Sequence, residues 1–249
     1  MCGRYASVAS RADLLERFAV DENNADELRG QDFNVTPTKT NPVVIARVLP
    51  DAGDDADPAR ELRAFRWGLL PFWAKTLGAG AKMINARAET VHEKPAYRSA
   101  FKSRRALIPC DAFYEWLETE QVGKAGRRLK QPFALRPADG STLPLAGLYE
   151  VWYDKALPHD DPNRVVPTYT IVTTTATDSV GRIHDRMPMA IAPDHWDAWL
   201  DPRNRNVDEL RGLMAPPADG GLDMFAVSKA VNNVRNNGPE LLEPLPTHD

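Results

Sequence analysis

The sequence predicts an α+β fold built mainly from antiparallel or mixed β-sheet. Segments rich in β-branched and aromatic residues outnumber segments with helical periodicity. Strands and helices do not alternate in the rhythm of βαβ units, and the chain has neither an internal repeat nor a heptad pattern. A chain of 249 residues with 43% hydrophobic residues can bury a substantial core. Its prolines are scattered and mark no linker, so we expect one domain spanning residues 1–249.

The expected elements follow in chain order. A helix is predicted over 10–18, where Ser10 is a suitable N-cap and apolar residues recur at Leu14, Leu15 and Phe18. The β-branched run PVVIARVL predicts a strand over 42–49, and the Pro, Gly and acidic residues that follow predict a mobile acidic loop over 51–61. Further strands are expected at 62–67, 105–109, 112–118, 132–136, 143–152, 166–175, 187–192 and 222–228. Helices are expected near 94–103, 193–200 and 206–214, and loops at 119–131 and 154–164.

Charge and composition limit the classes of function. The formal net charge is −4, so no global basic field attracts nucleic acid, although a local basic cluster holds Arg98, Lys102, Arg104 and Arg105. This cluster is either a nucleic-acid contact or an ordinary solvated helix face. No apolar run approaches the length of a membrane span, and no signal-peptide core follows Met1, so we expect a cytoplasmic protein without membrane contact.

Cysteine and histidine usage argues against disulfides and metals. Cys2 and Cys110 are too few for a disulfide framework. The five histidines show no metal-ligand spacing with them, so neither a metal nor another cofactor is expected.

The first residues, Met-Cys-Gly-Arg, predict an unusual nucleophile. A small residue at position 2 permits removal of Met1, which would leave Cys2 with a free α-amine beside its thiol. Both groups have reference pKa values near neutrality, about 7.7–8.0 and about 8.5. Such a 1,2-aminothiol can condense with an aldehyde to an imine, which the thiol then closes to a five-membered thiazolidine. The alternative is a chance cysteine in an N-terminal arm.

Two strand-like segments carry polar groups in informative places. In an extended segment Asn85, Arg87 and Glu89 share one face, where they could orient a nucleophile and grip a phosphate. The alternative is a surface ion pair between Arg87 and Glu89. In the second segment, 112–118, Glu115 lies on the same face as Phe113 and Leu117. Desolvation there would raise its pKa toward that of a general acid or base. If the opposite face of that strand is the buried one, Glu115 is simply solvated.

Two further segments are weaker signals. His184 follows a threonine-rich strand and stands beside Asp185 and Arg186, which could set the environment of a proton-transferring imidazole. A His-Asp pair is often only structural. The aromatic residues of 65–73 could stack on bases if they are exposed, or they could form a core strand and turn.

Taken together and in order, these motifs resemble the SRAP family, the SOS response-associated peptidase-like, abasic-site processing proteins. The resemblance rests on MCGRYA at the start, FNVTPT at 33–38, RWGLLPFW at 66–73, INARAET at 84–90, PCDAFYEW at 109–116, IVTTTATD at 171–178, IHDRMP at 183–188 and VSKAVNNVRNNGPELLEPL at 227–245. It implies a single-domain α+β fold whose sheet curls into a barrel-like core with peripheral helices. It further implies a thiazolidine crosslink to abasic sites in single-stranded DNA, a lyase-like activity, and an autocatalytic peptidase activity.

The resemblance also implies roles for individual residues. The active-site groups would be Cys2, Asn85, Glu115 and His184. The DNA-binding residues would be Arg4, Asn34, Trp67, Pro71, Arg87 and Thr173. Our mechanistic hypothesis makes His184 the acid that opens the abasic sugar, Glu115 the proton shuttle, and Asn85 the group that holds the α-amine. The expected partner is single-stranded DNA, the expected state a monomer, and the expected location the cytoplasm, with association to the nucleoid.

Two other functions use the same residues. In the first, Cys2 is the nucleophile of a thiol peptidase assisted by His184 and Glu115. In the second, the protein binds single-stranded DNA without a covalent bond, and Cys2 is incidental.

Overall fold

A closed five-stranded barrel forms the centre of the protein. The computed structural model describes residues 2–25, 30–49, 56–123, 126–218 and 220–246. The strand order runs β11-β5-β4-β7-β10 and returns to β11. Strands β11 and β5 pair in parallel and the other four pairings are antiparallel, so the barrel is mixed. Its strands are β4 (Thr40–Arg47), β5 (Ala59–Trp67), β7 (Arg105–Cys110), β10 (Leu143–Tyr153) and β11 (Val165–Thr175).

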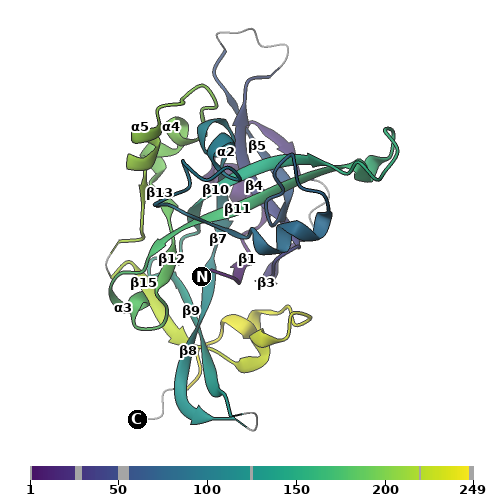
Figure 1. The fold of residues 1–249 in the computed structure, drawn as a ribbon. Coiled ribbons are helices and arrows are strands. Elements are labelled where there is room, and N and C mark those ends of the chain that lie inside the picture. The colour runs from purple at the N-terminus through teal and green to yellow at the C-terminus, as the bar shows by residue number, and fades with distance from the viewer. Residues whose placement is uncertain (1, 26–29, 50–55, 124–125, 219, 247–249) are drawn as a thin grey trace.

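A second sheet adjoins the barrel, in the order β15-β9-β8-β1-β3. Figure 1 shows its β8–β9 hairpin extending away from the barrel, while α4 and α5 cover one side of the molecule. The strands of this sheet are β1 (Tyr5–Ser7), β3 (Asp32–Val35), β8 (Ala112–Val122), β9 (Arg128–Pro137) and β15 (Leu222–Ala226).

Short elements complete the described chain. The remaining strands are β2 (Glu22–Asn24), β6 (Asn85–Arg87), β12 (Arg186–Pro188), β13 (Ala190–Ile191) and β14 (Met214–Ala215). The α-helices are α1 (Arg11–Arg17), α2 (Arg98–Ser103), α3 (Asp178–Gly181), α4 (Trp196–Leu200) and α5 (Val207–Gly212). The 3₁₀ turns are η1 (Leu77–Lys82), η2 (Pro162–Arg164), η3 (Pro193–His195), η4 (Lys229–Asn232) and η5 (Pro239–Leu242).

This architecture confirms the predicted α+β fold with a barrel-like core. Helix α1 begins after Ser10, the predicted N-cap, and the structure adds a capping box between the Ser10 and Asp13 side chains. The predicted acidic loop 51–61 is shorter than expected, because Ala59 already begins β5, while residues 51–55 lie outside the described chain. The predicted loop 119–131 is also largely wrong, since β8 continues to Val122 and β9 begins at Arg128.

The basic cluster near α2 is in part structural. Arg105 is 1% exposed, and its guanidinium donates hydrogen bonds to the carbonyl oxygens of Phe101, Trp199, Asp201 and Asn204. A buried guanidinium is tolerated when its donors are satisfied. Arg105 therefore ties α2 and α4 to the barrel and is not part of a DNA-binding surface.

Within the described residues, no helix is both long enough and apolar enough to span a membrane.

Candidate active site

The N-terminal segment runs along the second sheet and brings Cys2 into the interior. Tyr5 lies opposite Phe113 of β8, and the Tyr114 amide donates to the Arg4 carbonyl at 2.9 Å. Figure 1 places this end of the chain at the middle of the molecule, beside β1 and β7. Cys2 itself is fully buried in the apolar cluster that fills the barrel. Burial, and secondly the negative charge of Glu115, raise the pKa of the Cys2 thiol, which is therefore neutral.

Asn85 contacts the backbone of Cys2 directly. Strand β6 pairs in parallel with β11, with Asn85 opposite Ile171. The Asn85 Nδ2 donates to the Cys2 carbonyl oxygen at 2.8 Å, and the Tyr97 hydroxyl donates to the Asn85 carbonyl at 3.2 Å. Among the described residues, the buried Oδ1 of Asn85 has no hydrogen-bond partner. An acceptor is thus held beside Cys2, as a group that binds an amine requires.

Glu115 is buried, which is the first of the two alternatives that the sequence leaves open. It is 2% exposed, lies opposite Phe133 of β9, and follows the buried pair Phe113 and Tyr114. Desolvation raises its pKa from 4.5 to about 7. Glu115 can therefore both take and give a proton at neutral pH, which favours the buried reading over the solvated one.

His184 lies in the turn between α3 and β12. Its Nδ1 is 3.0 Å from the Arg186 amide nitrogen and 2.8 Å from Asp185 Oδ1. These contacts need opposite proton states, because the amide donates to a bare Nδ1 whereas the carboxylate accepts from a protonated one. Desolvation lowers the pKa of His184, so the neutral form dominates, with Nδ1 accepting from the amide and the proton on Nε2. Asp185 is placed to stabilise the imidazolium once it forms.

An ion pair that the sequence did not predict links two of these segments. Glu89 pairs with Arg186, at 2.8 and 3.0 Å, and not with Arg87. The same guanidinium donates to the Thr173 carbonyl at 2.5 Å. The Arg186 hydrogen bonds hold the pKa of Glu89 down at about 2. Arg186 stands beside His184 in the sequence, but nothing in the pattern indicates which carboxylate it contacts.

The predicted DNA-binding residues differ in their exposure. Arg87 is exposed, as a phosphate contact requires. Trp67, Asn34 and Thr173 are at most 1% exposed, and Pro71 is also buried. The Trp67 indole donates to the Ile84 carbonyl and packs against Tyr5 and Tyr169. These four side chains are enclosed by the protein, and their role in binding DNA stays a prediction.

Arg4 is half-buried and already bonded within the protein. Its Nη1 donates to Asn34 Oδ1 and to the Val231 carbonyl, both at 2.6 Å.

Two exposed aromatic residues follow the buried Pro71 directly in the chain. Phe72 is 77% and Trp73 is 53% exposed, in the loop between β5 and η1. Two local features define the conformation of this loop. Gly68 has φ +119°, and a Cβ there would lie 2.5 Å from the Gly80 carbonyl oxygen, so only glycine fits. The Trp152 indole anchors the far side of the loop by donating to the Ala74 carbonyl at 2.9 Å.

No group of three His, Cys, Asp or Glu side chains able to hold a metal ion occurs within the described parts of the chain. The four predicted active-site residues include one thiol, one carboxyl and one imidazole, and each has a proton-transfer or nucleophilic use without a metal.

Comparison with known proteins gives consistent matches along the chain. A family model described as SOS response associated peptidase (SRAP) matches residues 1–234. The abasic site processing protein YoqW of Bacillus subtilis (strain 168) is 35% identical over 243 residues, covering 98% of this chain and 99% of the relative. The abasic site processing protein HMCES of Gallus gallus is 29% identical over 280 residues, covering 98% and 78%. A crystal structure of a Bacteroides thetaiotaomicron protein, 21% identical, has the same fold with a TM-score of 0.78, covering 98% of this chain and 100% of that one.

Proposed function

The chain belongs to the SOS response associated peptidase (SRAP) family, and from this premise we propose that it captures abasic sites in single-stranded DNA as a thiazolidine adduct on Cys2, after Met1 is removed. The contact of Cys2 with Asn85, beside the raised-pKa carboxyl of Glu115, is the observation that carries the proposal. The printed names of the relatives, abasic site processing proteins, support the substrate class.

The chemistry balances without an oxidant or a cofactor. The α-amine of Cys2 adds to the sugar aldehyde to give a carbinolamine, which loses one water to form an imine. The thiol then adds across the C=N bond, so that one C–S and one C–N bond join protein and sugar. The net change is loss of a single water molecule.

Each proton transfer has a nearby group. Glu115 takes the proton of the Cys2 ammonium and later that of the neutral thiol, and it returns one to the departing hydroxyl. Asn85 holds the Cys2 backbone, and its Oδ1 can accept from the α-amine. Because its neutral form dominates, His184 acts as the base that takes the sugar hydroxyl proton as the ring opens, in place of the acid role expected from the sequence, and Asp185 stabilises the imidazolium that forms.

The thiol peptidase alternative fits this environment less well. A peptidase needs a thiolate, and burial and Glu115 raise the Cys2 thiol pKa instead of lowering it. Incubation of the processed protein with a peptide library, read by mass spectrometry, separates the two functions, since our proposal expects no cleavage.

The pH dependence of crosslinking tests the role of Glu115. Because the Glu115 pKa is about 7, its basic form is scarce at pH 5.5 and dominant at pH 8.5. The α-amine loses its proton near the same range, at about 7.7–8.0. The single-turnover rate should therefore rise with pH from 5.5 to 8.5, as Glu115 loses its proton near 7 and the α-amine at about 7.7–8.0. A rate that falls over this range would assign the essential group an acidic role and contradict the proton-acceptor step.

The exposed aromatic residues predict how unpaired DNA binds. Stacking of a base on an aromatic side chain contributes roughly 1–3 kcal/mol. A Phe72→Ala, Trp73→Ala double variant should weaken equilibrium binding of an intact single-stranded oligonucleotide by about tenfold or more, measured by fluorescence anisotropy.

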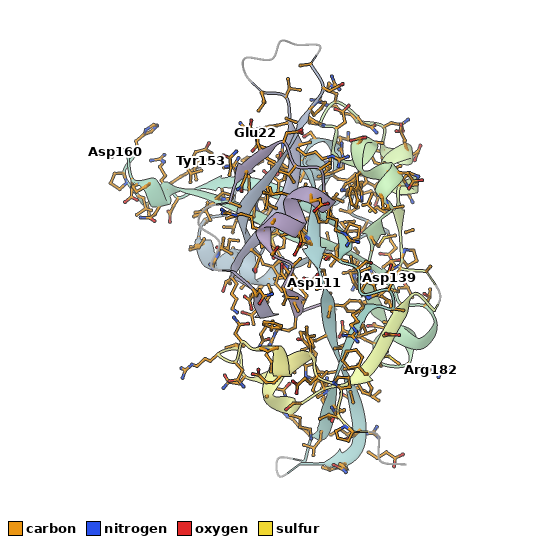
Figure 2. The ribbon with its side chains drawn as sticks, turned by 180° about the vertical axis from the view of Figure 1, so that it is seen from behind. Glu22, Asp111, Asp139, Tyr153, Asp160 and Arg182 are labelled. Carbon is orange, nitrogen blue, oxygen red and sulfur yellow. The ribbon has the colours of Figure 1, made fainter. Side chains whose placement is uncertain are left out.

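Tyr153 provides a matched control, since it is 52% exposed but lies on the β10–β11 hairpin that projects from the barrel (Figure 2). Tyr153→Ala should leave binding unchanged. Equal losses in both variants would show that the loop carrying Phe72 and Trp73 has no special part in DNA binding.

A further inference from the structure

A C-terminal segment is packed against the residues that carry the nucleophile. This segment, residues 228–237, comprises η4 and the asparagine-rich stretch after it. Figure 1 shows this part of the chain, in yellow, beside β8 and β9 and below β3. It lies more than 220 positions from Arg4 along the sequence, yet it contacts Arg4 and Trp116. None of its residues takes part in the proposed proton transfers.

Asn34 is the centre of this contact. Its side chain is fully buried. Its Nδ2 donates to the carbonyl oxygens of Asn236 at 2.8 Å and Asn233 at 3.1 Å, and lies 3.4 Å from that of Val231. Its Oδ1 accepts from Arg4 Nη1 at 2.6 Å. Both polar atoms of the amide thus join β3 to the N-terminal segment and the C-terminal segment.

Arg4 extends the connection toward both reacting groups. Its Nη1 also donates to the Val231 carbonyl at 2.6 Å, and its guanidinium lies 5.7 Å from the centre of the Trp116 ring. The Trp116 indole in turn donates to Asn232 Oδ1 at 2.7 Å. Arg4 is two residues after Cys2, and Trp116 is one residue after Glu115. Residues 228–237 therefore contact the chain next to Cys2 through Arg4, and the chain next to Glu115 through Trp116.

We propose that Asn34 is a positioning residue for Cys2: through Arg4 and residues 228–237 it fixes the N-terminal segment against β8, so that the α-amine faces Glu115 and Asn85. This inference rests on the proposed function. It replaces the DNA-contact role that the family resemblance implies for Asn34. Misplacing a reacting group by about 1 Å can cost on the order of 100-fold in rate, even when the altered residue is remote.

The variant Asn34→Asp separates positioning from DNA contact. A carboxylate still accepts from Arg4 but cannot donate to the carbonyl oxygens of Asn233 and Asn236. Single-turnover crosslinking at saturating abasic oligonucleotide should slow by about tenfold or more, while the Kd for an intact oligonucleotide changes by less than about threefold. The Arg4→Lys variant breaks the same connection from its other end and should slow crosslinking similarly. The double variant should be no slower than the worse single one.

Gln131→Ala is the matched control. Gln131 Nε2 donates to the carbonyls of Pro132 and Val227, just before the segment, and neither of these hydrogen bonds involves Arg4 or the Trp116 side chain. Its crosslinking rate should stay within about twofold of the wild type. If Asn34→Asp reacts at the wild-type rate, or only its Kd changes, the positioning role is wrong.

A second measurement needs no DNA and therefore survives failure of the proposed function. Loosening the N-terminal segment should speed alkylation of Cys2 by iodoacetamide at least about fivefold in Asn34→Asp, relative to the buried Cys110 in the same molecule, because alkylation requires local opening. Unchanged alkylation of Cys2 overturns the inference. Absence of any adduct from the wild type, with alkylation changed as expected, refutes only the crosslinking proposal.

Discussion

Replacement of Cys2 by alanine is expected to abolish the adduct that survives denaturation, because it removes the thiol that closes the ring. Cys2→Ser keeps the α-amine and a hydroxyl, so it can form the imine but not the thiazolidine. Its product should therefore appear only after borohydride reduction. Both variants should retain equilibrium affinity for intact single-stranded DNA, since the Cys2 side chain is fully buried and offers no surface to the strand.

Denaturing gels and intact-mass spectra of protein incubated with an abasic oligonucleotide measure this directly. The wild-type mass should first show loss of Met1 and then gain the mass of the oligonucleotide less one water. Cys110→Ala serves as the control, since its thiol is buried in the same apolar cluster but has no α-amine beside it. A heat-stable adduct in Cys2→Ala would refute Cys2 as the nucleophile.

Glu115→Gln should have the second largest effect: it should lower the crosslinking rate and raise the stability of the fold. Loss of the proton acceptor should slow crosslinking by about 10²–10⁴-fold, the usual contribution of general acid-base catalysis. The same change should stabilise the fold at neutral pH. The folded-state pKa is about 7 against 4.5 for the ordinary group, so between these values the folded protein binds more protons than the unfolded chain. Its stability therefore falls as pH rises through this window, because a buried carboxylate must ionise.

Urea unfolding of both proteins at several pH values tests the stability effect. Glutamine does not ionise, so the advantage of Glu115→Gln should grow from pH 4.5 to pH 7 and then level off, at most on the order of 3 kcal/mol. Glu118→Gln is the control on the same strand, since Glu118 is exposed and pairs with Lys130 at 3.4 Å. It should alter neither rate nor stability. A constant difference between wild type and Glu115→Gln at all pH values would show that Glu115 does not titrate in this window.

The sequence predicted well those features that depend on local pattern. The capping residues before α1 and the apolar row around Glu115 are short-range signals, and the structure has both. The barrel is closed by the parallel pairing of β5 with β11, in which Arg66 lies opposite Thr168. No local pattern encodes such a pairing. Strand β6 has only three residues, too few for a period to appear, yet its pairing with β11 positions Asn85.

Local sequence pattern does not show whether a polar or aromatic side chain is buried in the protein or exposed. The family resemblance implies a DNA contact for Asn34, and no local pattern indicates that its amide donates to carbonyls some 200 positions away. Trp67 and Trp73 stand six residues apart in one aromatic segment, and only the second is exposed. Burial of this kind is decided by tertiary packing, which the composition of a segment does not reveal.

The complete enclosure of the Cys2 side chain bears on selectivity inside a cell. A cysteine at the end of a flexible arm would react with formaldehyde, methylglyoxal and other diffusing metabolites, and each such event would consume the protein. Packed in the barrel and neutral, the sulfur is a weaker nucleophile toward such small electrophiles than an exposed thiolate would be. Under the proposed function, a bound single strand would deliver its one damaged sugar at high local concentration, and the burial of Cys2 would then favour that aldehyde over freely diffusing ones.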